Sequence, residues 1–249
     1  MRLAILSDTH GLLRPQVTEL LETADAILHG GDINTVSYTH LDVYKRQALE
    51  VMAQGENISV QGNLTVLSPS YPTDTALIFY PGAKVEAEAY LPLLDRIRQD
   101  GICCILVEMP FRMAIFDWDA AAEVIPQFPD IQHWYIGGHS MGGAMASQFA
   151  SRNPDQVEGL ILMGAYIYGD YSPENALTVY GSLNQSVEDK IDYTQNVYEI
   201  QGGNHAQFGN YGPQKGDLPA TITAEEQQEQ TALVIGEFLA RQNQTETAG

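Results

Sequence analysis

The sequence is poor in cysteine, in positive charge and in long apolar runs, and each shortage excludes something. Its two cysteines, Cys103 and Cys104, are neighbours within an apolar run. Because neighbouring residues of a strand point to opposite faces of a sheet, the two thiols are poorly placed to bond each other, and we interpret them as small buried side chains. No apolar run approaches the roughly 18 residues that a membrane span requires. Residues 1–8 turn acidic too early for a secretory signal.

Positive charge is the second shortage. Only 12 lysines and arginines stand against 32 acidic residues, which gives a formal net charge of −20. Such an excess disfavours a surface for nucleic acid or for anionic membrane. We therefore expect a protein that is soluble as written and cytoplasmic by default, with no nucleic-acid partner and no membrane span.

Apolar runs and helical patterns alternate along most of the 249 residues, a length that suffices for one large α/β domain or two small ones. Continuous apolar runs are typical of parallel strands with helices on both faces of the sheet. We expect such strands at residues 76–80, 102–107, 134–136, 157–163, 176–180 and 197–200, and a hairpin of edge strands at 57–68. Helical patterns cover 87–99, 118–128, 141–152, 187–195 and 223–242, the last with Thr223 as N-cap and Glu226 as its capping-box partner.

A Gly-x-Ser-x-Gly motif, Gly138 to Gly142 with Ser140 at its centre, lies between an expected strand and an expected helix. Strand, tight turn and helix form the context in which this motif predicts a nucleophile elbow. The turn strains the serine backbone and projects its hydroxyl from the sheet edge, while the flanking glycines allow a close approach of strand and helix. The context favours Ser140 as a nucleophile over an inert serine in a glycine-rich turn.

Three segments carry a family resemblance: residues 77–85, 137–143 and 202–209. Together they make the chain from about residue 48 onward resemble a small α/β-hydrolase of the dienelactone-hydrolase-like kind. The resemblance implies an α/β-hydrolase fold, a mostly parallel doubly wound sheet with an N-terminal hairpin, and cleavage of a small-molecule ester without a cofactor. About ten residues separate Ala165 from Ala176, where larger hydrolases insert a cap. We therefore expect no cap domain and an open, shallow site, and we leave the oligomeric state open.

A serine hydroxyl needs a base to become a nucleophile at neutral pH. The only histidine after the motif is His205, in a glycine-flanked loop behind the last expected strand, which matches the order Ser, acid, His of α/β-hydrolases. An oxyanion hole needs two backbone N–H groups. Met141 is expected to supply one and Gly82 or Ala83 the other, because Pro81 has none.

The acid of the expected triad is the open question. The resemblance places it in the turn after residues 178–180, where Asn184 stands at the expected position. Asparagine can orient a histidine but does not offset the imidazolium charge, and the equivalent Asp-to-Asn change in a serine protease lowers turnover by about four orders of magnitude. Asp170 is the alternative acid, and Asp189 and Glu108 are weaker alternatives. If none serves, the fold is catalytically weak or silent and acts in binding.

Residues 1–35 do not fit the hydrolase pattern. A strand at 3–6, a helical stretch at 15–23 and a second strand at 26–29 are expected, and the two strands are followed by Asp-x-His and Gly-Asp motifs. This opening resembles the truncated start of a calcineurin-like metallophosphoesterase, in which Asp8, His10 and Asp32 would be metal ligands. That chemistry needs two metals and further ligands, which are not evident. We therefore expect a vestigial site without catalytic metal, and metal-dependent phosphoester cleavage is the least favoured function.

The segment 36–47 has no amphipathic period and resembles a translated adapter or vector sequence of the kind found in assembled metagenomic proteins. We interpret the chain as a chimera, with a natural linker as the alternative. Its parts are a metallophosphoesterase-like β-α-β fragment at 1–35, an artefactual junction at 36–47, the α/β-hydrolase domain at 48–242 and a polar tail at 243–249.

Overall fold

The computed structural model describes residues 3–6, 26–29, 47, 50–52 and 57–246, and the chain divides into two compact units, Met1–Val43 and Tyr44–Gly249. In the first unit, strands β1 (Leu3–Leu6) and β2 (Ala26–His29) pair in parallel. This pairing agrees with the two expected strands. The helical stretch expected at 15–23 lies outside the described residues, as do Asp8, His10 and Asp32.

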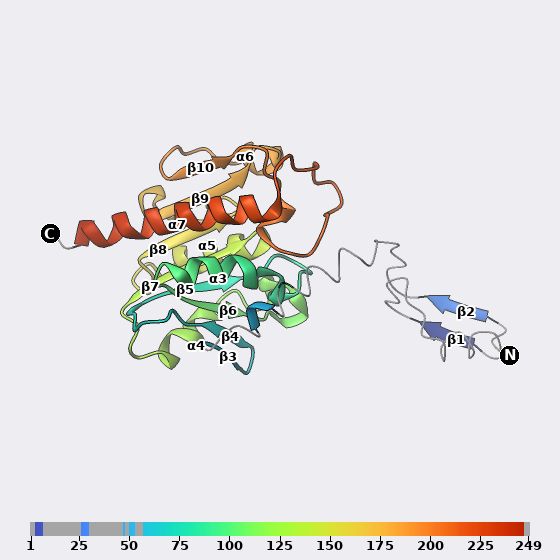
Figure 1. Ribbon diagram of the computed structural model, residues 1–249, viewed down its shortest axis with the longest axis horizontal. Coiled ribbons are helices and arrows are strands. Elements are labelled where there is room, and N and C mark those ends of the chain that lie inside the picture. Colours follow the sequence, from blue (N-terminus) through green and yellow to red (C-terminus); the bar gives the residue numbers. More distant parts are fainter. Residues whose placement is uncertain (1–2, 7–25, 30–46, 48–49, 53–56, 247–249) are drawn as a thin grey trace. The chain divides into compact units, whose positions relative to one another are not determined.

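The second unit is built on one eight-stranded sheet, with the order β10-β9-β8-β7-β5-β6-β4-β3. The strands from β10 to β6 run parallel, and the hairpin of β3 and β4 pairs antiparallel with β6 at one edge (Figure 1). This arrangement confirms the predicted mostly parallel sheet with an N-terminal hairpin. The strands are β3 (Ile58–Gln61), β4 (Leu64–Leu67), β5 (Thr75–Tyr80), β6 (Cys103–Val107), β7 (His133–His139), β8 (Gly159–Met163), β9 (Ala176–Gly181) and β10 (Val197–Ile200).

Helices cover both faces of this sheet. On one face lie α3 (Leu91–Gln99) and α7 (Ala224–Glu246), side by side in Figure 1, and on the other lies α5 (Met141–Arg152). Alternate residues of each strand therefore enter two separate cores. Cys104 belongs to the core under α3 and α7 and Cys103 to the core under α5, and both are buried free thiols. The interpretation of the cysteines as small buried side chains is confirmed.

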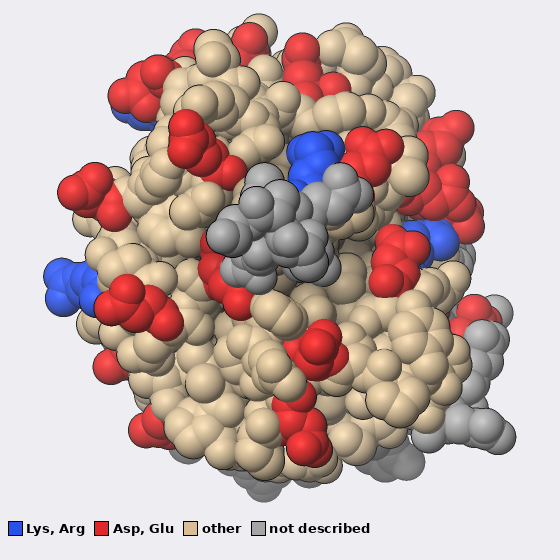
Figure 2. Space-filling view, turned by 90° about the vertical axis from the view of Figure 1, so that its left-hand side faces the viewer, with Lys and Arg blue, Asp and Glu red and all other residues tan. Residues whose placement is uncertain are grey.

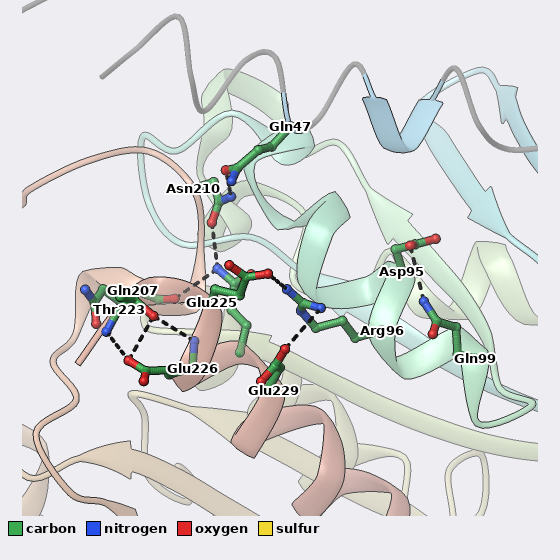
Figure 3. Close-up of polar contacts among 11 residues, drawn as sticks. Gln47, Asp95, Arg96, Gln99, Gln207, Asn210, Thr223, Glu225, Glu226 and Glu229 are labelled. Carbon is green, nitrogen blue, oxygen red and sulfur yellow. Dashed lines mark hydrogen bonds and ion pairs between the residues drawn. The ribbon is translucent and has the colours of Figure 1, made fainter. Parts of the chain in front are cut away.

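The N-terminus of α7 carries the expected capping box (Figure 3). The Glu226 carboxylate accepts hydrogen bonds from the Thr223 N–H at 2.8 Å and from its hydroxyl at 2.9 Å. In return, the Glu226 N–H donates to Thr223 Oγ1 at 3.1 Å. These bonds lower the pKa of the Glu226 carboxyl. The predicted start of this helix is confirmed.

Two of the expected helices are much shorter than predicted. The helix expected at 187–195 is only α6 (Gln185–Glu188). The chain leaves it because the Tyr193 hydroxyl bonds Thr178 Oγ1 at 2.7 Å and accepts the Ile167 N–H at 3.0 Å. The pattern at 118–128 yields α4 (Ala121–Val124) and a 3-10 turn, Ile125–Gln127, that includes Pro126. Tertiary hydrogen bonds and a proline therefore override the local pattern.

Among the described residues, no cap domain separates β8 from β9. Between β8 and β9 the chain forms only a short 3-10 turn, Pro173–Asn175. In the described part of the chain, no helix has both the length and the apolar character needed to cross a bilayer. Figure 2 shows that acidic side chains spread over the end of the molecule at which α7 ends, and that lysines and arginines are few there. This face matches the acidic composition.

Candidate active site

The turn between β7 and α5 places Ser140 in a strained backbone conformation. Its φ is 55° and its ψ is −120°, a combination that L-residues rarely adopt and that costs of order 1–3 kcal/mol. Two backbone hydrogen bonds fix this conformation. The Ser140 N–H donates to the Met163 carbonyl at 3.0 Å, and the Ser140 carbonyl accepts from the Ala144 N–H at 3.0 Å. The surrounding sheet therefore maintains the strain at one residue.

Glycines allow α5 to start directly against the end of β5. A Cβ atom at Gly138 would lie 2.5 Å from the Tyr80 carbonyl oxygen, and one at Gly142 would collide with the carbonyl oxygens of Tyr80 and Pro81. Only glycine fits at both positions. The helix N-terminus and the loop after β5 are thus brought together around Ser140.

His205 lies in the loop that follows β10, and two fully buried glutamines of α7 hold that loop. Gln227 accepts the Asn204 N–H at 3.0 Å and donates to the Asn204 carbonyl at 2.8 Å. Gln228 donates to the Gln207 carbonyl at 3.1 Å and to the Asn210 side chain at 2.6 Å. Figure 3 shows Gln207 and Asn210 beside the start of α7. The position of His205 therefore depends on the closing helix.

The ring of His205 is paired with Asn184, the residue at the expected acid position. Nδ1 of His205 lies 2.7 Å from Nδ2 of Asn184, and the Ser186 hydroxyl bonds Asn184 Oδ1 at 3.0 Å. Asn184 is itself buried. Burial lowers the pKa of His205, and the negative charge of Asp217 opposes this effect. His205 is therefore an uncharged imidazole at neutral pH.

A buried hydrogen-bond chain links the loop after β5 to the histidine loop. The Gly82 N–H donates to Tyr90 Oη at 3.0 Å, Tyr90 Oη lies 2.8 Å from His139 Nδ1, and His139 Nε2 lies 2.9 Å from the His205 carbonyl oxygen. A carbonyl oxygen can only accept, so His139 carries its proton on Nε2 and Tyr90 donates to Nδ1. We name Gly82, Tyr90, His139 and the His205 carbonyl the Tyr90 chain.

His139 is uncharged within the Tyr90 chain. The residue is 1% exposed, and burial, followed by the proximity of His205, lowers its pKa well below the usual value. The ring centres of His139 and His205 are 4.6 Å apart. The Tyr90 chain joins the loop after β5, a 3-10 helix that ends at Tyr90, the end of β7 and the loop after β10. No local sequence pattern indicates these contacts.

The structure bears on which backbone N–H groups are free to serve as oxyanion donors. The N–H of Gly82 is engaged with Tyr90 Oη, which leaves Ala83 as the candidate on the loop after β5. Met141 is the first residue of α5, where backbone N–H groups have no partner within the helix. The loop is held by the Lys84 N–H, which donates to the Arg112 carbonyl at 2.8 Å.

The structure does not bring the alternative acids to His205. Asp170 is exposed and lines a hollow with Trp134 and Asn175, which lie at the opposite end of the parallel strands from Ser140. Asp189 is exposed at the end of α6, and Glu108 is exposed after β6. The carboxylate that does reach the histidine loop is Asp217, which sequence reasoning missed.

A small hollow of about 220 Å³ opens beside the loop after β5. Pro81, Val85 and Met109 form its apolar lining. Arg112 is paired with Glu86 at 3.2 Å across the same hollow, so its charge is offset. Among the described residues, no group of three or more His, Cys, Asp or Glu side chains is placed to hold a metal ion.

A mostly parallel eight-stranded sheet, with helices on both faces and a strained serine between strand and helix, defines a protein of the α/β-hydrolase class. The chain belongs to the alpha/beta hydrolase family, whose model matches residues 76–229. The predicted resemblance is confirmed. Residues 1–96 also match the calcineurin-like phosphoesterase superfamily domain, a longer span than the 35 residues of the predicted fragment. Strands β3, β4 and β5 lie within that span, and all three belong to the hydrolase sheet.

Individual relatives are distant. A protein of Mycobacterium phage D29, described as a non-heme haloperoxidase, is 28% identical over 102 residues, and the match spans only 37% of either chain. The solved structure of Est1E from Butyrivibrio proteoclasticus is 15% identical, with a TM-score of 0.51 over 74% of this chain and 98% of that one. A dienelactone hydrolase from Anabaena variabilis is 14% identical, with a TM-score of 0.45 over 72% of this chain and 90% of that one. At 15% identity, the likeness to Est1E shows a shared fold and nothing finer.

Proposed function

We propose that the protein is a serine hydrolase that cleaves a small carboxylic ester through an acyl-enzyme on Ser140, with His205 as the base. The observation that carries this proposal is the strained conformation of Ser140 between β7 and α5. Such strain persists only where the surrounding structure fixes it, and it concentrates at functional sites. Family membership supports the same reading.

The proposed chemistry follows from the groups around Ser140. His205 Nε2 removes the hydroxyl proton as Ser140 Oγ attacks the ester carbonyl, and the N–H groups of Met141 and Ala83 stabilise the oxyanion. Collapse of the tetrahedral intermediate expels the alcohol, which takes the proton from His205. Water, activated by the same histidine, then releases the acid and restores the hydroxyl. The hollow of about 220 Å³ lies beside the loop after β5, which carries the candidate oxyanion donor Ala83.

Asn184 must present its oxygen to His205 for this mechanism. Nε2 can accept a proton only if Nδ1 carries one, and an Nδ1–H needs an acceptor. The structure directs the Asn184 amide nitrogen toward Nδ1 and its oxygen toward the Ser186 hydroxyl. A half-turn of the carboxamide exchanges the two ends, and Ser186 then accepts where it had donated. The proposed active form has this exchanged orientation.

The observed amide orientation favours a second candidate, a catalytically silent fold that acts in binding. With Nδ2 of Asn184 donating to Nδ1, His205 carries its proton on Nε2 and cannot take one from Ser140. A fluorophosphonate probe separates the two candidates. The serine hydrolase is labelled at Ser140 and hydrolyses short-chain acyl esters, and Ser140→Ala loses both properties. A folded wild-type protein that neither reacts nor cleaves any short-chain ester would support the silent fold.

A further inference from the structure

Asp217 is a carboxylate bound to the backbone of the candidate base itself. Its Oδ1 accepts the His205 N–H at 3.2 Å, and its Oδ2 accepts the Ala206 N–H at 2.7 Å. The side chain is half-buried, in a loop between β10 and α7 that Asn204 helps to hold by donating to the Leu218 carbonyl at 2.8 Å. Both oxygens are thus fixed beside the histidine loop.

The position of Asp217 matters because His205 gains a positive charge in the proposed transition state. A triad acid normally does two things: it holds the ring in the productive tautomer, and it stabilises the imidazolium. Asn184 can do the first but is neutral. His139, at the end of β7, lies beside the His205 ring, and Tyr211 lies beside His139 on the same side of the site. His139 is uncharged, so it contributes no negative charge.

We propose that two residues share the task of the missing acid, with Asn184 holding the ring of His205 and Asp217 supplying the negative charge through its fixed place on the same loop. This inference rests on the proposed function. Asp217 is a positioning residue, because it bonds the backbone of His205 and touches neither the ring nor the substrate. The negative charge of Asp217 raises the pKa of His205, as this role requires.

The alternative role for Asp217 is purely structural. Its bonds to two successive N–H groups cap the short 3-10 turn Ala206–Phe208, and a cap needs an acceptor but no charge. The two roles differ in one respect. If the role of Asp217 is its charge, a carboxylate introduced at position 184 can replace it. If its role is to cap the turn, a carboxylate at position 184 cannot restore the lost hydrogen bonds.

The test is a cycle of Asp217→Asn, Asn184→Asp and the double variant, with Asp189→Asn as a control that removes an exposed carboxylate. We measure the pKa of His205 by NMR titration and kcat and KM on one activated ester. Asp217→Asn should lower the His205 pKa and reduce kcat with little change in KM, and kcat should fall about tenfold for each pKa unit lost. The double variant should recover the His205 pKa and kcat, and Asp189→Asn should change neither of these two quantities.

Two results would overturn the inference: an unchanged His205 pKa in Asp217→Asn, or a double variant whose His205 pKa stays as low as in the single variant. If Asp217→Asn does not fold, Asp217→Ser keeps an acceptor for the N–H groups without the charge and enters the same cycle. The NMR titration requires no turnover. A protein without esterase activity therefore refutes the proposed function, while the pKa still decides the role of Asp217.

Discussion

Removing one hydroxyl from the Tyr90 chain should lower both stability and turnover. Tyr90→Phe keeps the ring in the core but leaves the Gly82 N–H and His139 Nδ1 without partners. Each unsatisfied buried group costs about 1–3 kcal/mol, so the loss of two partners should lower the free energy of unfolding by about 2–6 kcal/mol. Because Gly82 adjoins the candidate oxyanion donor Ala83, the loop should also lose its position. Misplacement by about 1 Å can cost a hundredfold in rate, and we expect kcat to fall at least tenfold.

Tyr80→Phe is the matched control for this experiment. Tyr80 is also fully buried, and its hydroxyl likewise bridges two backbone groups, accepting the Ala121 N–H at 2.8 Å and donating to the Trp118 carbonyl at 3.2 Å. Its loss should reduce stability comparably but leave kcat nearly unchanged. Urea denaturation gives the stability, and turnover of an activated ester, normalised by active-site titration, gives kcat. The reasoning fails if Tyr90→Phe retains full kcat, or if both variants lose kcat equally.

Three further predictions follow from the glycines, the histidines and the division of the chain. Gly142→Ala should abolish folding or activity because its Cβ meets backbone oxygens, whereas Gly216→Ala, with a φ of 89° and nothing within 4 Å, should cost only about 1–2 kcal/mol in a thermal melt. His139 and His205 have lowered pKa values in the folded state, so the unfolded state binds more protons below pH 6.5. The free energy of unfolding should therefore decline as the pH falls below 6.5, with a slope of at most about 1.4 kcal/mol per pH unit for each histidine, and His205→Ala should reduce that slope. A protein that starts at Ala48 should retain cooperative unfolding of its sheet; loss of folding would contradict the proposed chimera.

The sheet was predictable because its signal is local. Buried strands such as β5 read as continuous apolar runs, and α5 follows a Gly-x-Ser-x-Gly motif whose meaning depends on its immediate neighbours. The end of α6 was not predictable, since it is set by a hydroxyl contact between Tyr193 and Thr178 on a distant strand. The local sequence pattern indicates whether a segment forms a helix or a strand, while the residue at which that element ends depends on its tertiary contacts.

The candidate site divides in the same way. Ser140 and His205 could be named because motif and chain order indicate them, although their roles stay predictions. Asp170 was a reasonable alternative by position after β8, but the loop carries it to the far end of the strands. Asp217 could not be found, because nothing in a glycine- and proline-rich loop indicates which backbone N–H groups its carboxylate meets.

The two buried glutamines of α7 determine how the protein should lose activity on heating. Gln227 and Gln228 fasten the histidine loop from the first turns of the last helix. Proteins open in cooperative segments of unequal stability, and a terminal helix can detach before the sheet that it covers. Release of α7 would free the base while leaving the serine in place. The temperature of half-inactivation should then lie below the midpoint of the sheet's unfolding, and protease should first cut the chain near this helix.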